Sequence, residues 1–115
     1  RDSYFFNQKS DEVRKYFKMN IKILNDAQND IAKAMLFYEN QKDKLGEYFL
    51  DSIMSDIESL YIYYGIHFKV KDYFRVLSKR FPFSIYYKFD KNFIYIYAVL
   101  DCRQNPILLN SRLKK

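Results

Sequence analysis

The stretch that decides the fold is residues 73–106, which read YFRVLSKRFPFSIYYKFDKNFIYIYAVLDCRQNP. Two segments within it, 83–89 and 93–100, are rich in the aromatic and β-branched residues typical of strands. The polar residues 90–92 between them predict a turn, and therefore a β-hairpin. Because segment 93–100 is apolar on both faces, it indicates either a central strand covered on both sides or a strand whose second face meets a partner.

Two helices are predicted before this hairpin. Between residues 26 and 40 the apolar side chains recur at helical spacing, with an N-cap at Asn25 or Asp26. A second stripe with the same period runs through 45–64, and Gly65 is placed to end it in a left-handed conformation. The link between the two stripes is short and polar, so we expect an antiparallel helical hairpin.

The order of elements predicts an α+β fold with one sheet. Residues 20–24 read as an N-terminal strand, and 68–71 and 73–79 as extended segments after the helices. We therefore expect a strand, a helical hairpin and a three-stranded antiparallel segment (β-α-α-β-β-β), with the helices on one face. Residues 19–115 form the predicted core domain. Residues 1–18 are an N-terminal extension with a short helix, either packed on the core or imitating a binding partner.

The composition limits the classes of protein to which the chain can belong. A chain of 115 residues with 49% hydrophobic side chains can form one domain without a metal or disulfide. A single cysteine excludes an intramolecular disulfide and fits a reducing compartment. No apolar run approaches the roughly 20 residues that a membrane helix needs. We expect a cytoplasmic protein that makes no membrane contact.

The positive charge is concentrated in the second half of the chain. Residues 66–115 contain eleven Lys or Arg and three Asp, whereas residues 19–65 contain four Lys or Arg and eight acidic residues. An acidic partner should therefore meet the second half. The lone histidine, His67, has no metal-ligand spacing with Cys102, and no glycine-rich phosphate loop exists, so we expect no metal and no small-molecule cofactor. Cys102 itself reads as a small buried or semi-buried residue.

Several short motifs carry a resemblance to a known family. They are the segments 26–31 (DAQNDI), 37–39 (FYE), 45–49 (LGEYF), 73–75 (YFR), 80–87 (RFPFSIYY) and 98–106 (AVLDCRQNP). In this order and spacing they resemble the RelE/ParE toxin superfamily of bacterial type II toxin–antitoxin systems. The resemblance covers residues 20–106, and the extension has no place in it. It implies a toxin of the plasmid-stabilisation type that arrests growth and is neutralised by a cognate antitoxin protein.

The resemblance leaves the target open, because RelE-like members cut messenger RNA on the ribosome and ParE-like members poison DNA gyrase. Arg75 and Arg103 match cationic positions of the RelE-like nuclease site. Ser84, however, stands where that site often has Arg, and Asp101 stands where many relatives have His. No Tyr or His follows Tyr97, so the acid–base set is incomplete.

We therefore favour a ParE-like toxin that acts by binding and is not an enzyme. The alternatives are an mRNA endoribonuclease (an mRNA interferase) with Arg75, Asp101 and Arg103 as catalytic residues, or a degenerate toxin that only binds antitoxin. The residues expected to bind the target or antitoxin are Arg75, Lys79, Arg80, Lys88, Arg103 and Arg112.

Each of these candidate sites also has a structural interpretation. Lys79 and Arg80 could protect a sheet edge, and Arg103 could pair with Asp101. The tail 107–115 predicts a short amphipathic helix or an added strand, and it is a candidate target-contacting element.

Overall fold

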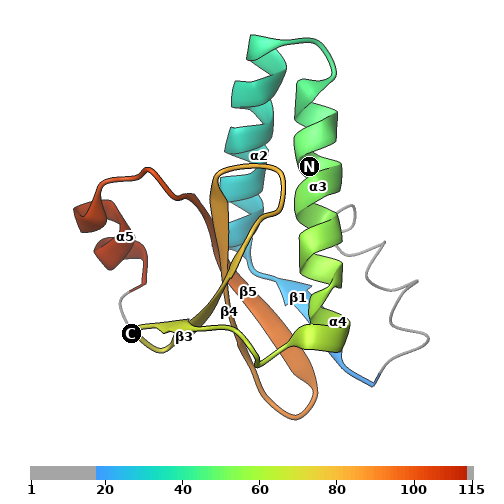
Figure 1. Cartoon of the computed structure of the whole chain (residues 1–115), viewed down its shortest axis with the longest axis vertical. Helices are drawn as coiled ribbons and strands as arrows, with labels where there is room; N and C mark the ends of the chain where they lie inside the picture. Colours follow the sequence, from blue (N-terminus) through green and yellow to red (C-terminus); the bar gives the residue numbers. More distant parts are fainter. Residues whose placement is uncertain (1–17, 114–115) are drawn as a thin grey trace.

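The computed structural model describes residues 18–113, so the predicted extension falls almost wholly outside the described residues. The elements are β1 (Asn20–Ile23), α2 (Asn25–Gln41), α3 (Leu45–Glu58), α4 (Leu60–Tyr63), β2 (Lys69–Val70), β3 (Tyr73–Leu77), β4 (Phe83–Phe89), β5 (Phe93–Asp101) and α5 (Pro106–Arg112). The predicted α+β layout is confirmed (Figure 1).

All five strands form one mixed sheet in the order β1-β5-β4-β3-β2. β1 runs parallel to β5, and every other neighbouring pair is antiparallel. The predicted hairpin is β4–β5, where the Asp90 carboxylate accepts hydrogen bonds from the backbone N–H groups of Asn92 and Phe93, both at 2.9 Å. β5 lies between β1 and β4, and its side chains enter a hydrophobic cluster on each face, so the interpretation as a central strand covered on both sides is confirmed.

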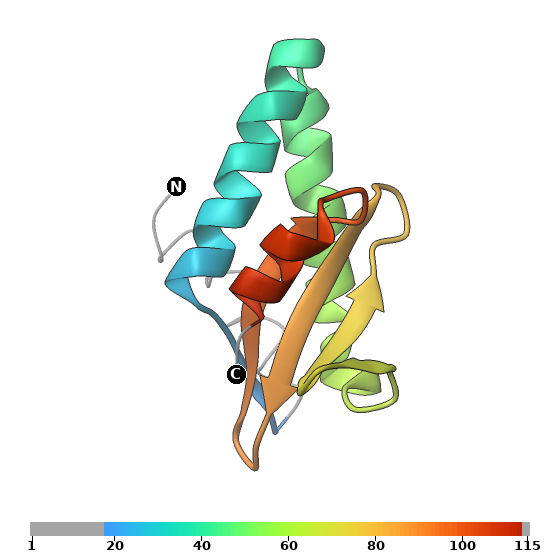
Figure 2. The ribbon, with the colours of Figure 1, turned by 90° about the vertical axis from the view of Figure 1, so that its left-hand side faces the viewer.

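Two hydrophobic clusters cover the two faces of this sheet. The larger one joins α2, α3 and α4 to the face that carries Ile85, Tyr87, Ile94 and Ile96. The smaller one joins the opposite face, with Tyr86, Ala98 and Leu100, to Leu109 and Leu113 at the end of the chain. The tail is therefore a helix, one of the two predicted alternatives, and Figure 2 shows α5 lying over β4 and β5.

A β-bulge makes this two-sided burial compatible with the sequence of β5. Tyr86 pairs with Ala98, but Tyr87 pairs with Ile96, so Tyr97 is an extra residue in the strand. The bulge leaves Tyr97 and Ala98 both with the smaller cluster and returns Val99 to the larger one. Strict alternation along the strand would have placed Val99 on the α5 face.

The helices differ from the prediction in two details. The expected helix over residues 45–64 bends at Ser59, where the side-chain hydroxyl donates to the Asp56 carbonyl at 2.6 Å. The predicted side-chain N-cap of the first helix is wrong, because the N-cap position is Leu24, which has no capping side chain. Gly65 adopts the expected left-handed conformation, with φ 90°.

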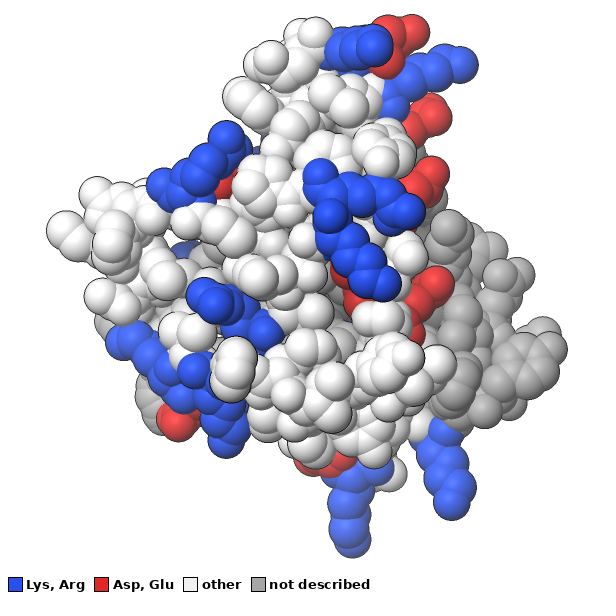
Figure 3. Space-filling model, viewed as in Figure 1, with Lys and Arg blue, Asp and Glu red and all other residues white. Residues whose placement is uncertain are grey.

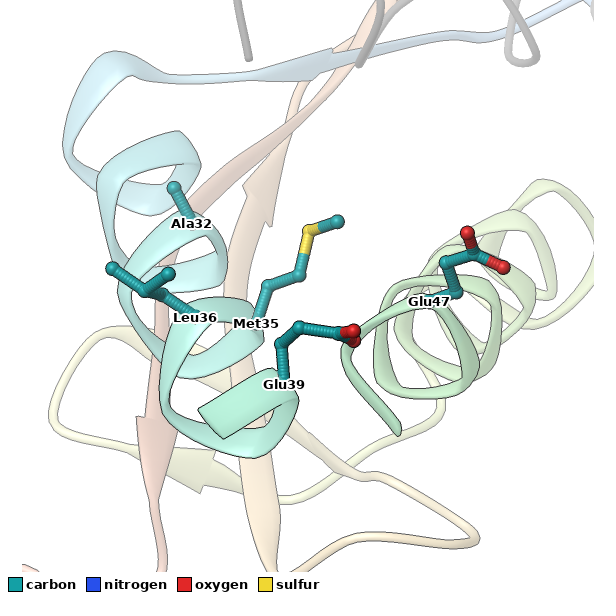
Figure 4. Close-up of a pocket in the computed structure, with 5 residues that line it drawn as sticks. All are labelled: Ala32, Met35, Leu36, Glu39 and Glu47. Carbon is teal, nitrogen blue, oxygen red and sulfur yellow. The ribbon is translucent and has the colours of Figure 1, made fainter. Parts of the chain in front are cut away.

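The tip of the helical hairpin is held by one carboxylate. Glu39 accepts the backbone N–H groups of Lys44 at 3.0 Å and Gly46 at 2.9 Å, and these bonds lower the pKa of Glu39. Figure 4 shows Met35 and Glu39 pointing from α2 toward α3, whereas Leu36 points away. The helices approach closely here, and a Cβ at position 46 would lie 2.6 Å from the Met35 carbonyl oxygen.

Gly46→Ala should therefore destabilise the fold, because the added methyl group meets backbone and cannot be accommodated by a side-chain rotation. We expect the free energy of unfolding to fall by about 1–3 kcal/mol, read from the midpoint of urea denaturation. Ser55→Ala, an exposed position on the same helix, is the matched control and should leave the midpoint nearly unchanged. Equal midpoints for both variants would contradict the close approach of α2 and α3.

Candidate functional site

The end of β5 holds a pre-formed ion pair. The Arg103 guanidinium donates to both carboxylate oxygens of Asp101, from Nε at 2.9 Å and from Nη2 at 2.6 Å. These bonds lower the pKa of Asp101, and the Tyr38 hydroxyl of α2 lies beside the same guanidinium. Burial raises the pKa of Tyr38, so its hydroxyl keeps its proton at neutral pH. The sequence interpretation of Arg103 as a partner of Asp101 is confirmed.

Arg75 lies elsewhere, on β3. It is half-buried and lines a hollow of about 380 Å³ together with Ile66, His67, Phe68, Val76 and Leu77. Within the described part of the chain Arg75 has no ion pair. Its positive charge therefore remains available to a partner that reaches this edge of the sheet.

The strand register separates Arg75 from the Asp101–Arg103 pair. Arg75 lies opposite Tyr86, which lies opposite Ala98, and Asp101 is three residues further along β5. With strands about 4.8 Å apart and about 3.3 Å per residue, the Cα atoms of Arg75 and Asp101 are roughly 14 Å apart. The three residues predicted as a catalytic set therefore form two separate groups, of which Asp101 and Arg103 make one.

The other predicted cations differ in how they are held. Lys79 and Arg80 are exposed on the β3–β4 connection, and no ion pair engages them within residues 18–113. The Lys88 ammonium lies over the rings of Tyr73, at 4.5 Å, and Tyr97, at 5.6 Å. Figure 3 shows Lys and Arg side chains in several separate groups on this side of the molecule, with uncharged surface between them.

Arg112, predicted as a binding residue, has a structural partner that the sequence analysis missed. Its guanidinium forms a two-pronged bond to Asp30 of α2, at 2.7 Å and 2.8 Å. The Asp30 carboxylate also accepts the backbone N–H of Val99 at 3.0 Å. The side chain of Asp30 is 12% exposed, so this link is largely shielded from water. The sequence did contain one signal of this link. Asp30 directly precedes Ile31 in the apolar stripe of α2, so its carboxylate could be expected to lie near the core and to need a partner.

Asp30 and Arg112 also line a hollow of about 320 Å³ on the same side as the ion pair. Its other charged or polar wall residues are Lys33, Asp101 and Gln104, and its apolar walls are Ala34, Phe83, Val99 and Leu100. Arg112 belongs to α5, which also exposes the apolar side chains of Ile107 and Leu108. The end of β5 therefore combines a polar hollow with an apolar helix surface, as a protein-binding site often does.

Cys102 is exposed, which contradicts the expectation of a buried or semi-buried thiol. The turn after Asp101 places it at the surface, with its sulfur 3.1 Å from the Ser84 hydroxyl. No group of three or more potential metal ligands occurs among the described residues. In the same part of the chain, no helix is both long and apolar enough to cross a membrane.

The Asp30–Arg112 link leads to a stability prediction. Asp30→Ala should lower the free energy of unfolding by about 2–3 kcal/mol, because it leaves the Arg112 charge and the Val99 N–H without their partner. Lys33→Ala, one turn further along α2 and exposed, is the control. In the double variant Asp30→Ala/Arg112→Met no shielded charge remains, so its cost in urea denaturation should be less than the sum of the single costs. Strict additivity would contradict the coupling.

Comparison with known proteins finds a solved structure with a similar fold. Neither a protein-family model nor a curated protein sequence matches the chain. The structure is similar to a solved structure described as the chromosomal ParDE TA system from P. aeruginosa, with a TM-score of 0.59 and 19% sequence identity. The match covers 71% of this chain and 94% of the other. The chain therefore shares its fold with a chain of that ParDE structure.

Proposed function

We propose that the chain is the toxin of a toxin–antitoxin pair, that it acts in the ParE-like manner by binding an essential protein target, and that DNA gyrase is this target. The fold similarity supports the class of protein. The observation that carries the mode of action is the separation of the predicted catalytic residues. Arg103 is neutralised by Asp101, and the Cα atom of Arg75 lies roughly 14 Å from that of Asp101, so the three residues predicted as catalytic do not form one cluster.

The unpaired cations are better suited to binding. Arg75 lies on β3, and Lys79 and Arg80 lie on the connection from β3 to β4. We call these three residues the basic edge. Its neighbours include exposed apolar side chains, Phe68 at 86% and Leu77 at 56% exposure. An acidic segment of a cognate antitoxin would neutralise this edge, and an acidic surface of the target would compete for it.

A second candidate, the mRNA endoribonuclease, is favoured by one specific observation. Tyr38, from α2, lies beside Arg103 and Asp101, which provides a neutral hydroxyl, a cation and a carboxylate in one place. A hydroxyl that keeps its proton could protonate a leaving oxygen, and the carboxylate could accept a proton. In this reading the catalytic group would be Tyr38, Asp101 and Arg103, with Arg75 binding the RNA backbone.

Expression in a bacterial host without an antitoxin tests the proposal. The wild-type chain should arrest growth and reduce the supercoiling of a reporter plasmid, while messenger RNA stays intact. The charge reversal Arg75→Glu/Lys79→Glu/Arg80→Glu should improve colony recovery about ten-fold or more, since it removes the electrostatic complementarity of the basic edge. Lys91→Glu, in the exposed β4–β5 turn, is the matched control and should remain toxic.

Primer extension on messages from the same cells separates the two candidates. Codon-phased cuts that disappear in both Tyr38→Phe and Arg103→Ala would establish the endoribonuclease and reject the gyrase proposal. Absence of growth arrest at every induction level, with folded protein present, would reject active toxicity altogether.

A further inference from the structure

The segment between α4 and β2 is anchored to the sheet through one buried hydroxyl. The Tyr87 side chain on β4 is fully buried, and its Oη accepts the Gly65 N–H at 2.9 Å. The same oxygen lies 2.6 Å from Nδ1 of His67, and the two rings meet edge to face. Within the described residues, these are the two polar contacts of the Tyr87 hydroxyl.

We assign the second bond as a donation from the Tyr87 hydroxyl to His67, because the Tyr87 oxygen already accepts one hydrogen bond. Since the Tyr87 oxygen accepts from Gly65, its own proton is free to be donated, and the neighbouring acceptor is Nδ1 of His67. The imidazole must then be neutral, with its proton on Nε2. A protonated imidazole would direct an N–H at the hydroxyl and leave the buried O–H without an acceptor.

The surroundings also favour the neutral imidazole. Burial lowers the pKa of His67 below its ordinary value of 6.5. Arg75 of β3 lines the same hollow, and Lys69 of β2 lies over the ring of Phe74, which stacks on Tyr87. Both groups are cations, and no carboxylate lines this hollow in the described part of the chain.

We propose that the His67–Tyr87 hydrogen bond is a proton-sensitive latch that fixes residues 64–68 against the open edge of the sheet. The segment carries Ile66, 73% exposed, and Phe68, 86% exposed, which form the lip of the hollow. β2 covers β3 only as far as Arg75, whose N–H is bonded to the Phe68 carbonyl. Leu77 pairs with Ser84 of β4, and no described strand pairs with it on the opposite side. Protonation of His67 breaks the His67–Tyr87 hydrogen bond. Ile66 and Phe68 are then no longer held in one position at the edge of the hollow.

The latch predicts a pH-dependent opening at Gly65. Amide hydrogen exchange of the full chain, followed by NMR at about pH 7.5 and about pH 5, measures it after correction for the intrinsic pH dependence of exchange. The protection factor of the Gly65 amide should fall about ten-fold at the lower pH, which corresponds to the loss of one hydrogen bond. The amide of Ile96 in β5 is the internal control and should keep its protection.

Two variants keep the test decisive. His67→Gln retains an acceptor that does not titrate, so Gly65 protection should be high and equal at the two pH values. Tyr87→Phe removes the hydroxyl, so Gly65 protection should be low at both values. His67 is the single histidine, and its imidazole signal should titrate at a higher pH in Tyr87→Phe than in the wild type. Unchanged protection in the wild type, or an identical imidazole titration in Tyr87→Phe, would overturn the latch.

The sign of the linked stability change follows from the direction of the pKa shift. The folded state binds this proton more weakly than the unfolded chain, so the free energy of unfolding decreases as the pH falls through about 6.5 toward the lower folded value. His67→Gln should lack this contribution, and urea denaturation at the two pH values measures the difference. An equal loss of stability in the wild type and His67→Gln would contradict the linkage.

Discussion

The Asp30 carboxylate links three parts of the fold, because it lies on α2 and bonds to both β5 and α5. β1 pairs with β5 only as far as Ile96, and beyond that point the Asp30 side chain takes the place of a strand by accepting the Val99 N–H. Arg112 balances the charge, so the same group fixes α5 to α2. An unpaired N–H and an uncompensated charge would both be costly at this shielded position, which makes the three-way link a constraint on the whole domain.

This link explains how a sheet with two apolar faces is completed by a short chain. The helical hairpin covers one face, but the opposite face of β4 and β5 depends on a helix of seven residues. A helix of that length gains little stability on its own. Burial of Leu113 and the bond from Arg112 to Asp30 provide the stability that so short a helix does not have by itself.

The same packing divides the cations of the second half into two kinds. Arg103, Arg112 and Lys88 are held by a carboxylate, a carboxylate and two aromatic rings, respectively. Lys79 and Arg80 project into solvent, and Arg75 borders the hollow at the basic edge. A count of charges along the sequence treats all six cations alike, although Arg103, Arg112 and Lys88 have partners within the folded chain. The proposed binding function therefore depends on the basic edge more than on the total charge.

The sequence by itself determined the order and type of the elements from β1 to β5, and it left the tail as either a helix or a strand. The change from helical to alternating periodicity after Gly65 marks the boundary between helices and strands, and periodicity is a local property of the chain. It also predicted the Asp101–Arg103 pair, since the two residues are neighbours in one turn. The bulge at Tyr97, the exposure of Cys102 and the bend at Ser59 were decided by packing that periodicity does not encode. Tertiary structure alone brought Asp30 to Arg112, 82 residues away, and His67 to Tyr87, because contacts across a sheet depend on strand order and register.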